Sequence, residues 1–190
     1  MKLLIAFGST EGQTQKITEW IAARVRAAGH EAEVYDSKRR LRGLDVDTFD
    51  AIIVAGSVHQ RRHQESIVGF ALAHQAQLEA KPSAFLSVSL SAALKNGEQD
   101  CRDYVEDFIE KSGWRPSNVL MVAGAVRYSE YDFFMEQIIR HVVMQGREPK
   151  DLKEDYELTD WEALGKFIDG FVDRAGARFT PPDTPDEEGR

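Results

Sequence analysis

The sequence predicts an α/β protein in which a parallel β-sheet lies between two layers of helices. Short runs of strand-forming residues alternate with stretches of helical periodicity along most of the 190 residues. Parallel strands joined by helical crossovers produce this alternation. The first run also ends in a loop rich in glycine and hydroxyl side chains, which is typical of the strand-to-helix turn in such a sheet. A chain of this length is expected to form one domain with a sizeable core.

Five runs are expected to form the strands, and four periodic stretches the helices. The strands are predicted at residues 2–7, 31–35, 51–55, 83–89 and 119–125, and the helices at 15–28, 64–77, 99–111 and 160–175. Gly29 follows the first helix at the position where a left-handed glycine commonly ends a helix. The strands therefore wind in both directions from the first one, with helices on both faces of the sheet.

The loop after the first strand has the composition of a phosphate-binding turn. Its predicted ligands are Ser9, Thr10, Glu11, Gly12, Gln13 and Thr14. Glycines and hydroxyls let several backbone N–H groups point at one spot, and the dipole of the next helix adds to the attraction for an anion. The Lys-Ser/Thr pair of nucleoside triphosphate loops and the G-x-G-x-x-G dinucleotide pattern are both missing. A terminal monophosphate fits best, and the alternative is an ordinary helix start rich in capping residues.

This loop resembles the FMN-binding loop of the flavodoxin family, which reads Ser/Thr-x-Thr-Gly-x-Thr. Ser9, Thr10, Gly12 and Thr14 match that pattern, whereas Glu11 stands where the family has threonine. The resemblance implies a flavodoxin-like three-layer sandwich with strand order 2-1-3-4-5 and FMN as the cofactor. FMN would then lie beyond the carboxyl ends of the strands, where the winding direction reverses.

The resemblance also implies that the loops after the third and fourth strands hold the flavin ring. The residues expected to flank it are Ser57, Val58, His59, Gln60 and Arg61 in one loop and Ser89, Leu90, Ser91, Ala92 and Lys95 in the other. In that reading their backbone groups donate to the polar edge of the ring. The alternative is that both segments are polar surface turns.

A closer resemblance runs through the second half of the chain. Residues 81–85, 114–116, 123–128 and 159–162 resemble successive landmarks of the menaquinone-dependent protoporphyrinogen IX dehydrogenase family, a flavodoxin-fold branch. The resemblance implies an FMN-dependent oxidoreductase of heme synthesis that takes hydride equivalents from protoporphyrinogen IX and passes electrons to a quinone. Candidate substrate contacts are Arg61, Arg62, Arg127 and Tyr128. Arginine forks suit the propionate groups, and solvated surface arginines are the alternative.

Residues 127–159 form an apparent insertion within a predicted FMN-binding domain of residues 1–178. Apolar residues recur at helical spacing over 132–145. This amphipathic stripe could lie on a membrane or a partner surface, or it could pack on the sheet as a core helix. Thr159 is expected to cap the last helix, and the proline- and acid-rich residues 179–190 are expected to be a disordered tail.

Charge and composition narrow the possible partners. The chain has 24 Lys and Arg against 32 Asp and Glu, a formal net charge of -8. This charge argues against general nucleic-acid binding and favours the alternative function, a flavodoxin-type electron carrier that docks on basic protein partners. Met1 and Lys2 lead directly into the first strand, so we expect a cytoplasmic protein, with peripheral contact at the inner membrane through 132–145 left open.

Metal and thiol chemistry are not expected. Cys101 is the single cysteine, which excludes an intramolecular disulfide and a cysteine metal cluster. His59 and His63 would lie one turn apart if their loop continued into a helix, but no further ligands complete a site. Oligomeric state, electron donor and electron acceptor are not determined by these patterns.

Overall fold

The computed structural model describes residues 1–39, 44–126 and 156–178. Its parallel sheet has the order β2-β1-β3-β5-β6, with the short strand β4 paired to β3. This confirms the predicted order 2-1-3-4-5, because β4 only shifts the strand numbers. The strands are β1 (Lys2–Gly8), β2 (Glu31–Asp36), β3 (Ala51–His59), β4 (Arg62–His63), β5 (Ser83–Ser89) and β6 (Val119–Ala123).

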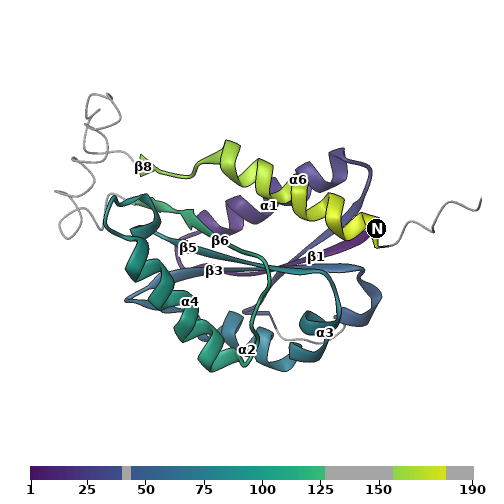
Figure 1. The fold of residues 1–190 in the computed structure, drawn as a ribbon, viewed down its shortest axis with the longest axis horizontal. Coiled ribbons are helices and arrows are strands. Elements are labelled where there is room, and N and C mark those ends of the chain that lie inside the picture. The colour runs from purple at the N-terminus through teal and green to yellow at the C-terminus, as the bar shows by residue number, and fades with distance from the viewer. Residues whose placement is uncertain (40–43, 127–155, 179–190) are drawn as a thin grey trace, which may run out of the picture.

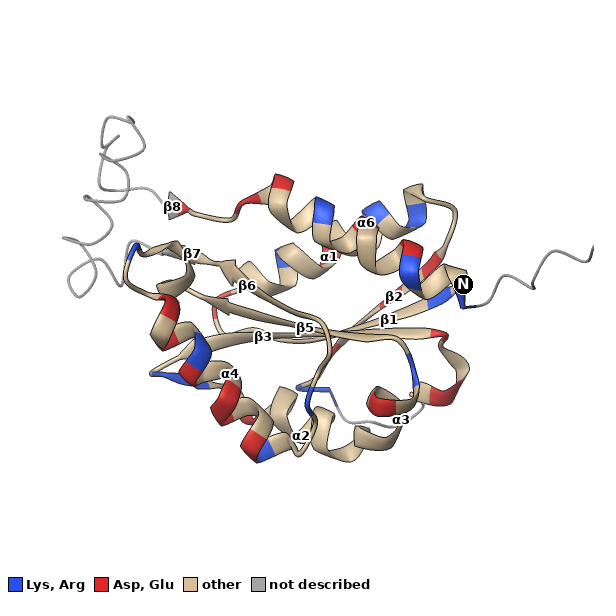
Figure 2. Cartoon of the chain, viewed as in Figure 1, with Lys and Arg blue, Asp and Glu red and all other residues tan. Residues whose placement is uncertain are grey.

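Helices cover both faces of the sheet (Figure 1). The helices α1 (Gln13–Ala27) and α6 (Trp161–Ala177) lie on one face, and α2 (Glu65–Ala73), α3 (Gln75–Ala80) and α4 (Glu98–Ser112) lie on the other. The central strands β3 and β5 carry no Lys, Arg, Asp or Glu, and these charged residues lie mainly on the helices and turns (Figure 2). Strands that are covered on both faces need apolar side chains on both faces, which is why these runs do not alternate.

Each face of the sheet has its own core. Leu3 and Ile5 point toward α1 and α6, while Leu4 points to the opposite core with Phe85 and Trp114. Trp114 is 1% exposed, so it is a packing anchor at the start of the turn into β6. Such alternation along one strand follows from the two-residue repeat of β-structure.

Two predicted elements differ from the structure. The helix expected at 64–77 is broken at His74, whose backbone leaves the helical region (φ -118°, ψ 24°) between α2 and α3. The third strand continues to His59 and turns back as β4, so the loop expected after Ala55 is largely a β-hairpin. Gln60 and Arg61 form its tip with positive φ values of 49° and 65°. Two such residues make the tight turn that matches the twist of a hairpin, and the helical spacing considered for His59 and His63 is therefore wrong.

The ends of the predicted insertion lie side by side. β7 (Ala125–Val126) and β8 (Tyr156–Glu157) pair as antiparallel strands. The segment 127–155 between them, with the predicted contacts Arg127 and Tyr128 and the stripe at 132–145, lies outside the described residues, as does the tail 179–190. In the part of the chain that is described, no helix is both long enough and apolar enough to span a lipid bilayer.

Candidate functional site

A hollow of about 70 Å³ opens at the carboxyl ends of the strands. Its lining comes from four strand ends that are distant in sequence. The lining residues are Ser9, Thr10, Glu11, Gln13, Thr14, Ser57, Val58, His59, Val88, Ser89, Leu90, Gly124 and Ala125. β1 lies between β2 and β3, so the hollow is at the point where the winding direction of the sheet reverses. This is where ligands bind in open α/β sheets.

The loop between β1 and α1 has a preformed cradle geometry. Gly12 adopts a left-handed conformation (φ 94°, ψ -15°), which a residue with a Cβ atom adopts only at a cost. Its N–H donates to Ser9 Oγ at 2.9 Å, which closes the loop. No side chain caps the start of α1, and its first turn contains no acidic residue. The first N–H groups of the helix therefore remain available for an anion.

Thr14 tests whether the cradle fits a phosphate group. Its side chain is 1% exposed, and Oγ1 has no hydrogen-bond partner within the described structure. A buried hydroxyl without a partner costs about 1–3 kcal/mol. An oxygen of a bound phosphate would accept this hydrogen bond, so the residues present fit the phosphate end of FMN.

Several polar contacts connect the cradle to neighbouring strands. Gln64 donates through Nε2 to Thr10 Oγ1 and to Ser57 Oγ, the latter at 3.0 Å. Lys38, from the turn after β2, donates through Nζ to the carbonyl oxygen of Ser9 at 2.7 Å. Sequence reasoning missed both Gln64 and Lys38, because only the pairing of strands brings them to the loop.

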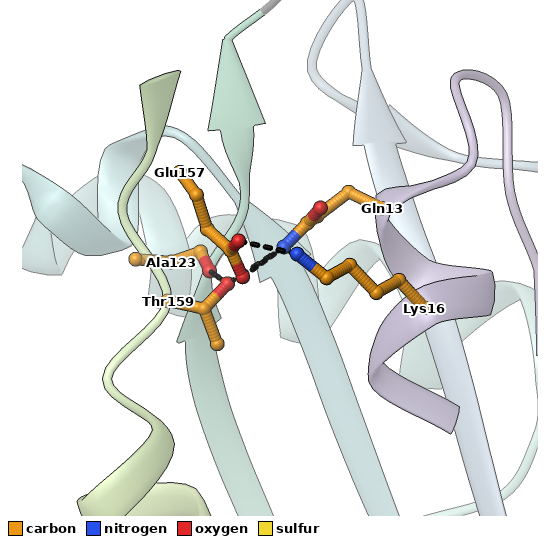
Figure 3. A network of polar contacts seen from close by, with 5 residues as sticks. All are labelled: Gln13, Lys16, Ala123, Glu157 and Thr159. Atoms are coloured by element: carbon orange, nitrogen blue, oxygen red, sulfur yellow. Dashed lines mark hydrogen bonds and ion pairs between the residues drawn. The ribbon is translucent and has the colours of Figure 1, made fainter. Parts of the chain in front are cut away.

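The segment that leads from β8 into α6 contacts the first turns of α1 (Figure 3). Gln13 donates through Nε2 to Glu157 Oε1 at 3.1 Å and to Thr159 Oγ1 at 2.9 Å. Lys16 forms an ion pair with Glu157, and Thr159 Oγ1 donates to the carbonyl oxygen of Ala123 at 2.8 Å. The amide nitrogen of Gln13 is thus used by this network, which leaves its backbone N–H as its contribution to the cradle.

The expectation that Thr159 caps the last helix is wrong. Asp160 is the N-cap of α6, since its Oδ1 accepts from the N–H of Ala163 at 2.9 Å. Threonine and aspartate are both common N-cap residues, so their order in the sequence does not decide between them. Thr159 instead joins α1 to the end of β6 through the network described above.

Some predicted ring-binding residues do not line the hollow: Gln60, Arg61, Ser91, Ala92 and Lys95. Arg61 is held against α4, because its Nη2 lies 3.1 Å from Asp100 Oδ1 and its guanidinium lies over the Tyr104 ring. Ser91 and Ala92 belong to the short 3₁₀ turn η2 (Ser91–Ala93). Val88, Gly124 and Ala125, which line the hollow, were not predicted as ligands. In the sequence, residues 123–128 resemble a family landmark, and within it Arg127 and Tyr128 are the residues predicted as substrate contacts.

His63 is buried and has a structural role. Its Nε2 is 3.0 Å from Ser87 Oγ, and its ring packs against Phe85 and Phe108. Burial lowers the pKa of His63 to about 4, so the ring is neutral at pH 7 and anchors the hairpin in the core.

Cys101 is also structural. It is 2% exposed, and burial raises the pKa of its thiol, which disfavours the reactive thiolate. Across the described ranges, no group of three or more His, Cys, Asp or Glu side chains is arranged to hold a metal ion.

The fold and the hollow define an α/β protein with a candidate ligand site at the switch point of its sheet. The family model for the flavodoxin domain matches residues 4–153. The chain belongs to the flavodoxin family, as the loop pattern predicted. It is an FMN-dependent oxidoreductase, and FMN is its cofactor.

Three known proteins show what this chain is similar to. The protoporphyrinogen IX dehydrogenase [quinone] of Escherichia coli strain K12 is 27% identical over 168 residues, which cover 88% of this chain and 92% of that protein. A short-chain flavodoxin associated with a non-canonical PDU bacterial microcompartment superposes with a TM-score of 0.56 at 14% identity, covering 92% of this chain and 99% of that one. The rubredoxin oxygen:oxidoreductase of Desulfovibrio gigas gives a TM-score of 0.55 at 12% identity and covers 95% of this chain, which spans 37% of that protein. The two structural matches support the fold.

Proposed function

We propose that this protein oxidises protoporphyrinogen IX and passes the electrons to a quinone, as a step of heme synthesis in the cytoplasm. The observation that carries the proposal is the β7–β8 pair beside the hollow. The two ends of the segment 127–155 pair as β7 and β8, and Gly124 and Ala125 beside them line the flavin hollow. The similarity to the E. coli dehydrogenase over 88% of the chain supports the same reaction.

The described residues have distinct roles in this proposal. The N–H groups at the start of α1 and the hydroxyl groups of Ser9 and Thr14 hold the phosphate. The strand ends at Ser57 and Ser89 line the same hollow as Ala125 and would hold the flavin ring. FMN held by these residues would supply the redox chemistry, that is, hydride and electron transfer.

Arg62 is the candidate anchor for a propionate of the substrate. It lies opposite His59 in the β3–β4 hairpin, and His59 lines the hollow. Arg61 is already paired with Asp100, whereas no ion pair engages Arg62 among the described residues. A free guanidinium at this rim can take a carboxylate in a bidentate contact.

Arg62→Gln is therefore expected to raise the KM for protoporphyrinogen IX by about fivefold, with little change in kcat, because an exposed charge contact contributes modestly to binding. Steady-state kinetics with a quinone acceptor would measure both constants. Arg61→Gln is the matched control, since it removes the same charge from the same hairpin. An equal rise of KM in both variants would show that net charge, rather than a contact with Arg62, causes the effect.

Anaerobic half-reactions test the function itself. Holoprotein mixed with protoporphyrinogen IX should lose the visible absorbance of oxidised flavin, and a menaquinone analogue should restore it. A flavin that stays oxidised with the porphyrinogen would contradict the proposal. Reduction by a flavodoxin reductase in the same preparation would then favour the second candidate below.

The second candidate is an electron carrier between protein partners. The observation that favours it is the charge of α4, which carries six acidic residues against Arg102 and Lys111 and begins beside the hollow. An acidic face next to a flavin steers the protein toward basic docking surfaces and speeds association. Strong salt dependence of electron transfer to a protein partner, without any reaction with porphyrinogen, would support this candidate.

A further inference from the structure

Lys38 reaches the phosphate cradle from a distant part of the chain. Its Nζ donates to the carbonyl oxygen of Ser9 at 2.7 Å. The same serine closes the cradle, because its Oγ accepts the N–H of Gly12 at 2.9 Å. The ammonium group of Lys38 is therefore bonded to the loop that is built to receive an anion.

The turn that carries Lys38 is fixed against the sheet. The N–H of Ser37 donates to the carbonyl oxygen of Phe7 at 2.8 Å, and Phe7 lies in β1 just before the cradle. The N–H of Lys38 donates to Asp36 Oδ1 at 2.9 Å, and the N–H of Arg39 donates to the carbonyl oxygen of Asp36 at 3.0 Å. The lysine is thus positioned before any ligand arrives, which reduces the entropy cost of using it.

The charges around the cradle leave Lys38 available. Lys16, the cation on the second turn of α1, is paired with Glu157. Lys38 has an uncharged carbonyl as its side-chain partner, so its charge is not neutralised by that contact. A phosphate group brings about two negative charges to this loop. A dianion at this position gains more from a nearby cation than neutral donors alone can give.

We propose that Lys38 is a cationic ligand of the 5′-phosphate of FMN. An ammonium group has three donors, so Lys38 can keep its bond to Ser9 and donate to a phosphate oxygen at the same time. Lys38 then adds a charge contact to the neutral donors of the loop pattern and increases the preference of the site for FMN over riboflavin, which lacks the phosphate. This inference rests on FMN binding in the cradle.

The test compares two ligands that differ only in the phosphate group. Apoprotein with Lys38→Met would be titrated with FMN and with riboflavin, following the quenching of flavin fluorescence. We expect the Kd for FMN to rise about tenfold and the Kd for riboflavin to stay unchanged, because only the phosphate contact is lost. Added salt should weaken FMN binding to the wild-type protein more than FMN binding to the variant.

Two further variants make the result specific. Arg39→Gln removes one positive charge from the same turn. The charge of Arg39 acts on Tyr35, where it opposes the rise of the Tyr35 pKa, so the Kd values of this variant should match those of the wild type. Lys38→Arg keeps the charge and should recover most of the affinity for FMN. Equal losses in Lys38→Met and Arg39→Gln, or an equal loss for riboflavin and FMN, would overturn the proposal. If the wild-type protein binds neither flavin, the cofactor assignment itself fails.

Discussion

Replacing Thr14 with valine is expected to stabilise the flavin-free protein and, at the same time, to weaken FMN binding. Oγ1 of Thr14 is buried without a partner, so the flavin-free protein bears the cost of an unsatisfied hydroxyl. Valine has nearly the same shape and replaces this hydroxyl with a methyl group. We expect the free energy of unfolding of the apoprotein in urea to rise by about 1 kcal/mol.

The same substitution removes a hydrogen-bond donor to the phosphate. Hydrogen bonds to charged groups contribute about 1.5–3 kcal/mol, so the Kd for FMN should rise at least about tenfold. Thr18→Val is the matched control, because Thr18 is also buried in α1 but its Oγ1 already donates to the carbonyl oxygen of Gln15 at 2.9 Å. The control should leave the affinity for FMN unchanged. A destabilised Thr14→Val apoprotein with normal FMN affinity would remove Thr14 from the site.

His63 should make the protein less stable as the pH falls from about 6.5 to about 4. Burial lowers the pKa of His63 to about 4 in the folded state, whereas an unfolded histidine titrates near about 6.5. Between these values the unfolded state binds a proton that the folded state does not, so the free energy of unfolding decreases. The full loss is about 3 kcal/mol and levels off below pH 4. Asp107 acts against the lowering of the pKa, and Lys111 adds to it.

Urea unfolding at pH 7 and pH 5 would measure this contribution. The wild-type protein should lose about 2 kcal/mol from this one group between the two values. Between the same two pH values, the free energy of unfolding of His63→Gln should fall by about 2 kcal/mol less than that of the wild-type protein, because the titrating ring is gone. This difference does not depend on the absolute stability of the variant. The control His59→Gln removes an exposed histidine from the same hairpin and should keep the wild-type dependence on pH. Equal pH dependence in His63→Gln and the wild-type protein would contradict the role of His63.

The sheet and the cradle could be predicted because their signals are local. Each of the five strand-forming runs, and each helical stretch between them, can be recognised from a short window of consecutive residues. The order of the strands follows from the family resemblance. The cradle consists of consecutive residues, from Ser9 to Thr14. Its geometry, including the left-handed Gly12, follows from the same short stretch.

The parts that could not be predicted depend on partners far apart in the chain or on unusual turns. The hairpin tip at Gln60 and Arg61 has positive φ at both positions without the Asn-Gly pair that usually indicates such a turn. Lys38 meets Ser9 only because β2 pairs with β1 in the observed register. Glu157 meets Gln13 across 144 positions of sequence. No pattern within a short window of sequence contains such contacts.

The pairing of β7 with β8 has a consequence for how this chain is related to shorter members of its family. Ala125 lies opposite Glu157 and Val126 opposite Tyr156, so a tight turn could join the two strands directly. Val126 and Tyr156, the two residues that flank the segment 127–155, are thus direct neighbours across the pair. The segment between them therefore leaves and re-enters the described fold at one place, so its length can differ between relatives while β7 and β8 keep their pairing.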